Sequence, residues 1–142
     1  MPITREQILT SLHTDWATFV ERFQCLSPEA KAVYLQQQGY VRFADLLAHI
    51  IAWCEDALQA IPAMFDDPGY VAPEHDVDLF NARAVERFHN LDEPAVITAF
   101  MDLYQQWLQL VNGLPDAAYQ NGKISDRLHI EIIGHFAEHH VP

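Results

Sequence analysis

Hydrophobic residues recur along the chain at intervals of three and four, the spacing of one face of an α-helix. The first such stretch predicts a helix from about Arg5 to Gln24, opened by a capping box between Thr4 and Gln7. Its apolar positions are Leu9, Leu12, Trp16, Phe19 and Phe23. Steps that alternate between three and four are typical of the seams of helical bundles.

Three further stretches carry the same pattern. One predicts a helix from about Val41 to Ile61 that is buried on more than one side, and we expect Pro62 to end it. The next opens at residues 92–94, where an Asp cap and an early Pro are typical of a helix start, and it ends near Gly113. The last opens at Ser125 or just before it.

The connecting segments are unequal in length. A short helix after Ser27 ends at Gly39 and is expected to act as a connector. Prolines and a glycine predict a loop over residues 63–74, and a short helix can follow from Asp76. The sequence therefore predicts an all-α fold. It would be a single domain over residues 1–142, a four-helix bundle with a long crossover between helices 2 and 3.

Two histidines continue the apolar stripe of the last helix. The stripe runs through Ile124, Leu128 and Ile132, and the next positions on that face are His135 and His139. Burying an imidazole costs free energy unless both ring nitrogens find partners. Either these histidines lie at a frayed helix end, or a ligand lies between them. Histidines at i and i+4 on a helix form a two-point chelate for a metal ion.

A metal site with one open position needs a third protein ligand. His49 is the one other histidine inside a strongly predicted core helix, at the border of its apolar arc. Its alternative role is that of a lone histidine bonded to a carbonyl or to water. The sequence nominates His49, His135 and His139 as ligands of a divalent metal. Zn, Ni and Fe all accept imidazole ligands, so the residues do not choose among them.

Carboxylates one turn before these histidines could support them. Glu131 precedes His135 by four residues and is a candidate fourth ligand, catalytic group or partner that fixes the imidazole tautomer. Asp45 precedes His49 by the same interval and could fix its tautomer. Each could instead be a plain surface carboxylate.

Residues 135–139 also read H-x-x-E-H, the inverted zincin pattern in which the Glu is a general base. That scheme needs a third ligand well downstream, and three residues follow His139. On a helix, Glu138 is also rotated by about 100° from His139. We therefore expect no protease.

Composition narrows the function classes. Half of the 142 residues are hydrophobic, enough for one sizeable core. A net charge of −12 argues against non-specific binding to nucleic acid or to an anionic membrane. The most apolar window, residues 46–61, is too short and too often interrupted to span a bilayer. The charged start is unlike a signal peptide, and two isolated cysteines make no disulfide framework, so we expect a cytoplasmic location.

Three segments resemble one known family. Residues 43–55, FADLLAHIIAWCE, resemble the second-helix signature of the DinB-like superfamily of four-helix-bundle metalloenzymes. Residues 134–139 are similar to its terminal H-x-x-x-H, and residues 80–83, FNAR, look most like the ClbS/DfsB branch. The resemblance covers nearly the full chain. It implies a divalent metal held by His49, His135 and His139, and a homodimer.

The activities assigned across that superfamily differ. They include thiol-dependent transfer or isomerisation and, in the ClbS-like branch, hydrolytic self-protection against a genotoxic natural product. No Arg-Gly-Gln follows the final histidine here, which weakens the case for a thiol-dependent transferase.

We therefore expect a metal-dependent enzyme that acts on a small molecule by hydrolysis or water addition, for example in detoxification or resistance. Trp53 and Asn81 would line its pocket, and Glu131 is the candidate catalytic residue. The alternatives are a non-catalytic bundle that sequesters a small molecule, and a thiol-dependent transferase.

Overall fold

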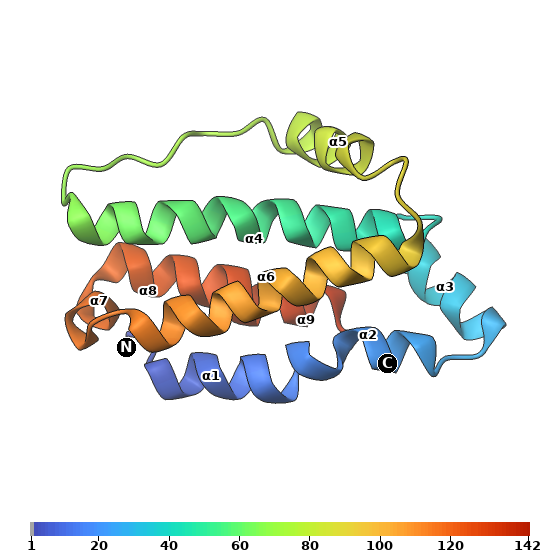
Figure 1. The fold of residues 1–142 in the computed structure, drawn as a ribbon, viewed down its shortest axis with the longest axis horizontal. Coiled ribbons are helices and arrows are strands. Elements are labelled where there is room, and N and C mark those ends of the chain that lie inside the picture. The colour runs from blue at the N-terminus through green and yellow to red at the C-terminus, as the bar shows by residue number, and fades with distance from the viewer. Residues whose placement is uncertain (1) are drawn as a thin grey trace.

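The computed structural model describes residues 2–142, and every regular element in that range is a helix (Figure 1). The predicted all-α class is therefore confirmed. The elements in chain order are α1 (Arg5–Thr14), η1 (Trp16–Thr18), α2 (Phe19–Gln24), α3 (Pro28–Gln38), α4 (Phe43–Asp66), α5 (Val77–Arg87), α6 (Glu93–Gly113), α7 (Asp116–Gln120), α8 (Gly122–Leu128), η2 (His129–Gly134) and α9 (His135–His139).

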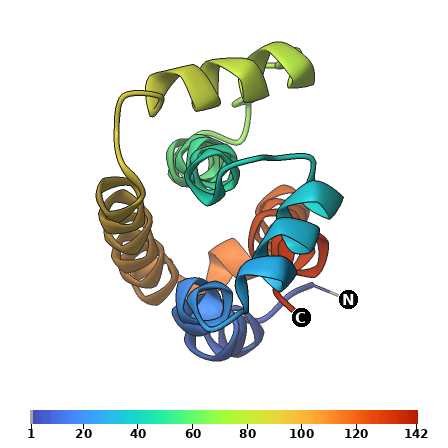
Figure 2. The same cartoon turned by 90° about the vertical axis from the view of Figure 1, so that its right-hand side faces the viewer.

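The long helix α4 occupies the middle of the packing. It lies against α6, α5 and α8, while α1 packs on α6 and on η2. Seen from one end, α5 lies outside α4, on the side away from α1 (Figure 2). All but two of the buried apolar side chains, Ala60 and Ala84, form one cluster among these helices. Within residues 2–142, no helix combines the length and apolarity needed to cross a bilayer.

The first predicted helix is interrupted. The structure breaks it after Thr14 and inserts the tight 3₁₀ turn η1 before α2. Hydroxyl groups here compete for backbone carbonyls: the Thr14 hydroxyl donates to the Thr10 carbonyl over 2.7 Å, and that of Thr18 donates to the Thr14 carbonyl over 3.0 Å. Such bonds bend helices. Trp16, in η1, is nevertheless buried as predicted.

Pro62 does not end the second predicted helix, so that expectation was wrong. α4 continues through Pro62 to Asp66. An interior proline removes one helix hydrogen bond and costs about 3 kcal/mol. Ile61 is fully buried, and Met64 and Phe65 pack against the core beyond the proline. Burial of these large side chains offsets the cost.

The last predicted helix is also not uniform. η2, between α8 and α9, is a π-helix, whose turn is wider than that of an α-helix. The indole N–H of Trp16 donates to the carbonyl of Ile132 in this segment over 2.8 Å. Both Glu131 and Ile132 are buried there. The segment thus turns a carboxylate as well as an apolar side chain into the core.

Candidate metal centre

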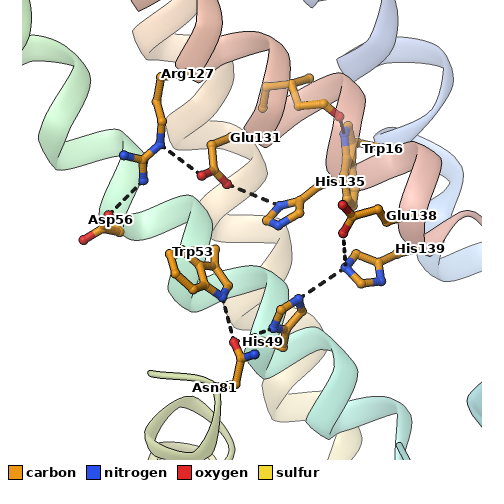
Figure 3. A network of polar contacts seen from close by, with 11 residues as sticks. Trp16, His49, Trp53, Asp56, Asn81, Arg127, Glu131, His135, Glu138 and His139 are labelled. Carbon is orange, nitrogen blue, oxygen red and sulfur yellow. Dashed lines mark hydrogen bonds and ion pairs between the residues drawn. The ribbon is translucent and has the colours of Figure 1, made fainter. Parts of the chain in front are cut away.

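The structure brings together the three histidines nominated from the sequence. His49 comes from α4, and His135 and His139 come from α9 (Figure 3). Each offers one ring nitrogen, and these three atoms lie within 4.8 Å of one another. His135 and His139 are buried, whereas His49 is half-buried. We call these residues the three-histidine cluster.

Trp53 and Asn81 fix the tautomer of His49. The indole N–H of Trp53 can only donate, and it donates to Oδ1 of Asn81 over 2.7 Å (Figure 3). The same oxygen lies 2.9 Å from Nδ1 of His49. Because this oxygen can only accept, Nδ1 of His49 must carry the proton. Nε2 of His49 is left with a free lone pair.

Gln38 and a backbone carbonyl fix the tautomer of His139 in the same way. The amide nitrogen of Gln38 donates to the Glu138 carbonyl over 3.1 Å, which orients the amide. Its oxygen then lies 2.7 Å from Nδ1 of His139. Nδ1 of His139 therefore donates, and its Nε2 also holds a free lone pair.

These two lone pairs face each other. The Nε2 atoms of His49 and His139 are 3.2 Å apart. Two acceptors at this distance repel unless a cation lies between them. Burial, with repulsion from His49 and His135, lowers the pKa of His139 to about 3. Burial also lowers the pKa of His49, against the opposing effect of Asn81. At neutral pH a proton is therefore a poor candidate for that cation.

A divalent metal ion fits the spacing. Two imidazole nitrogens bound to zinc at about 2.0–2.1 Å, with a tetrahedral angle between them, lie about 3.3 Å apart. The observed separation of 3.2 Å is close to this value. The three-histidine cluster can therefore hold a metal ion.

Glu131 lies beside the third histidine. Its Oε2 is 3.3 Å from Nδ1 of His135, and neither atom has a hydrogen-bond partner. Arg127 donates from Nε to Oε1 of Glu131 over 3.0 Å and from Nη2 to Asp56 over 2.8 Å. Burial raises the pKa of Glu131 to about 7, although Arg127 opposes the rise. Burial and repulsion from His49 and Arg127 lower the pKa of His135 to about 4.

Cys54 adjoins this pair. Its sulfur, a carboxylate oxygen of Glu131 and a nitrogen of His135 also lie within 4.8 Å of one another. Burial raises the pKa of the Cys54 thiol well above its ordinary value. Without a bound metal ion, the thiol therefore stays protonated and neutral.

Two expectations about carboxylates change. Asp45 is not the partner of His49, since its carboxylate faces Arg42 at 3.9 Å and Asn81 of α5 occupies the place beside His49. Glu138 was expected to be rotated by about 100° from His139 on the helix. Its side chain is 70% exposed, yet its Oε2 lies 3.8 Å from Nε2 of His139. A solvent-exposed carboxylate therefore borders the cluster.

The end of α9 is held in place. The Tyr34 hydroxyl donates to the His139 carbonyl, Gln38 donates to the Glu138 carbonyl, and Val141 is buried. Both tethering side chains belong to α3, which the sequence presented only as a connector. No apolar periodicity links α3 to α9, so their pairing had no signal in the sequence. The alternative of a frayed helix end does not describe this segment.

Trp53 and Asn81, predicted to line a pocket, have a more specific place. Both belong to the hydrogen-bonded group around Nδ1 of His49 (Figure 3).

Comparison of the chain with protein-family models, with curated proteins and with solved structures finds no match.

Proposed function

We propose that this chain is a DinB-like four-helix bundle that binds one divalent metal ion through His49, His135 and His139. It would act on a small molecule by hydrolysis or water addition. The proposal rests on one observation: the Nε2 atoms of His49 and His139 lie 3.2 Å apart, and each carries a lone pair. The Nδ1 atom of each ring already donates a hydrogen bond, so neither Nε2 carries a proton. A bound cation stabilises such a pair of acceptors, one on a buried ring and one on a half-buried ring.

When bound, the metal would lower the pKa of a coordinated water to about 7 or polarise a substrate oxygen. The chain's own residues orient the ligands. Asn81 and Gln38 hold the rings of His49 and His139 through Nδ1. Such supporting hydrogen bonds fix the tautomer and raise the basicity of a ligating imidazole.

Two carboxylates are suited to hold or move a proton. Glu131 lies against Nδ1 of His135, and its pKa of about 7 allows it to exchange a proton near neutral pH. Glu138 is exposed beside Nε2 of His139 and is placed to exchange protons between the cluster and water. Glu131 thus remains the candidate catalytic residue nominated from the sequence, and Glu138 joins it.

Metal content tests the binding step. Protein without a His tag would be loaded separately with Zn, Ni or Fe, desalted and measured by elemental analysis. We expect about one ion per chain in the wild type and less than about 0.2 in His49→Ala, His135→Ala and His139→Ala. His13→Ala is the matched control, because His13 is exposed on α1. A wild-type content below about 0.2 with all three metals would contradict the proposal.

Turnover separates an enzyme from a protein that only sequesters its ligand. Metal-loaded protein would be offered small esters, lactones and epoxides in excess. An enzyme forms many product molecules per chain and stops when a chelator removes the metal. A sequestering protein depletes at most one molecule per chain and releases it unchanged. The homodimer and the cytoplasmic location implied earlier stay predictions, and light scattering would test the first.

A further inference from the structure

A cleft of about 360 Å³ lies between α4 and α5, apart from the three-histidine cluster. Its volume falls within the range of about 300–1,000 Å³ that is typical of small-molecule sites. The side chains that matter for its chemistry are Glu55, Asp56, His75, Phe80, Arg83 and Arg87. None of the three clustered histidines lines it. We call it the α4–α5 cleft.

The charges that line this cleft are almost all paired. Glu55 binds Arg87 at 2.9 Å. Asp56 binds Arg127 at 2.8 Å and lies 2.9 Å from Nε2 of His75. Arg83 differs, because it has no hydrogen bond or ion pair with any side chain of residues 2–142. The formal charges of the lining, Glu55 and Asp56 against Arg83 and Arg87, sum to zero. Arg83, which is exposed, is therefore the lining guanidinium that has no ion-pair partner within residues 2–142.

An aromatic ring forms part of the same wall. The Phe80 ring packs in a tilted arrangement against Trp53, with centroids 4.1 Å apart, and against His75 at 4.6 Å. These two contacts hold the Phe80 ring, which remains half-buried and so partly open to the cleft. Phe80 and Arg83 are three residues apart on α5 and therefore lie on one face of that helix.

We propose that the α4–α5 cleft binds a small organic anion, with an aromatic body against Phe80 and a carboxylate or phosphate on Arg83. A guanidinium presents a planar fork of donors that matches these anions in two-point contacts. With a net charge of −12, the protein repels anions at long range, so binding depends on this local pairing. The inference does not require a metal in the three-histidine cluster.

Titration with defined probes tests the proposal. Benzoate and phenyl phosphate carry both features, whereas inorganic phosphate lacks the ring and benzyl alcohol lacks the charge. The Trp53 indole N–H resonance in a ¹H–¹⁵N NMR spectrum reports binding, because Trp53 contacts Phe80. We expect the two aromatic anions to shift it with a Kd of about 1 mM or lower, and the other two probes to bind at least about tenfold more weakly.

Substitutions then assign the contacts. Arg83→Gln should weaken binding of both aromatic anions at least about tenfold, since it removes a charge-assisted pair. Arg22→Gln is the matched control, because Arg22 is exposed on α2, outside the α4–α5 cleft, and it should bind as the wild type does. Phe80→Leu should weaken benzoate binding and leave that of inorganic phosphate unchanged.

Three outcomes would overturn the proposal. The first is that no aromatic anion shifts the Trp53 resonance at 10-fold the expected Kd, about 10 mM. The second is that Arg83→Gln binds as tightly as Arg22→Gln does. The third is that Arg83→Gln and Phe80→Leu both leave binding unchanged while His49→Ala abolishes it, which would place the anion at the three-histidine cluster. Binding that persists in chelator-treated protein supports the proposal even if the metal hypothesis fails.

Discussion

Replacing Asn81 by Leu tests the tautomer argument directly. Oδ1 of Asn81 accepts from Nδ1 of His49 over 2.9 Å and from the indole of Trp53 over 2.7 Å. Leucine has a similar size and offers no acceptor. Nδ1 of His49 would then lose the partner that keeps its proton, and the ring could place its proton on Nε2 instead. A protonated Nε2 has no lone pair for a metal ion.

The loss can be estimated from that hydrogen bond. A hydrogen bond to a group that gains positive charge, as a metal-bound imidazole does, contributes about 1.5–3 kcal/mol. Because about 1.4 kcal/mol corresponds to a factor of ten, metal affinity should fall about 10- to 150-fold. Removing the hydrogen-bond partner of a metal-bound histidine generally lowers metal affinity roughly 10- to 100-fold, which agrees with this estimate.

Competition with a chromophoric chelator would measure the affinity, and urea denaturation would measure stability separately. Trp53→Phe is the matched control: it removes the indole donor and keeps the Asn81 side chain, whose Oδ1 can still accept from Nδ1 of His49. We expect it to lower stability by about 1 kcal/mol and to change metal affinity by less than about threefold. Asn81→Asp keeps the acceptor and should bind metal at least as tightly as the wild type. Equal affinities for the Leu variant, the Phe control and the wild type would refute the reasoning.

Three other predictions follow from the buried charges and from the proline inside α4. Without metal, the lowered pKa values of His135 and His139 mean that the unfolded chain binds protons first as pH falls below 6.5. Glu131, with a raised pKa, binds its proton first in the folded chain and so offsets one of the two histidines. Urea denaturation should therefore show the free energy of unfolding falling by about 1.4 kcal/mol per pH unit from pH 6.5 to 4.5. A rise in stability over this range would contradict those shifts. Arg127→Met leaves the carboxylate of Glu131 without its cation and should cost about 3 kcal/mol, again by urea denaturation. Pro62→Ala restores one helix hydrogen bond and should raise stability by about 1 kcal/mol, seen as a higher Tm.

The histidine cluster could be predicted because it follows helical periodicity. His135 and His139 continue an apolar stripe, and His49 borders another, so burial on facing helices brings the three together. The supporting residues could not be predicted in the same way. Asn81 was nominated only as a pocket residue, and Gln38 was not nominated. Their roles depend on how α5 and α3 lie in space, which no local pattern encodes.

Helix boundaries, too, could be predicted only in part from local sequence patterns. The stripe from Leu12 to Phe23 places its residues in the core, yet threonine hydroxyls bend the backbone between them. Pro62 is a strong local signal for a helix end, and burial of Ile61 and Phe65 overrides it. In both cases the pattern of burial was predictable, whereas the backbone responded to particular side-chain contacts.

The position of α5 has a consequence for the dynamics of the site. α5 lies outside α4, and of its own residues only Ala84 is fully buried, so it should open by local unfolding more readily than the core helices. Opening α5 removes Asn81 from His49, and with it part of the metal affinity. By thermodynamic linkage, bound metal must then hold α5 closed to the same extent. Amide hydrogen exchange in α5 should therefore slow when metal is added, while α6 keeps its protection. Metal binding at the three-histidine cluster would thus set how often α5 opens.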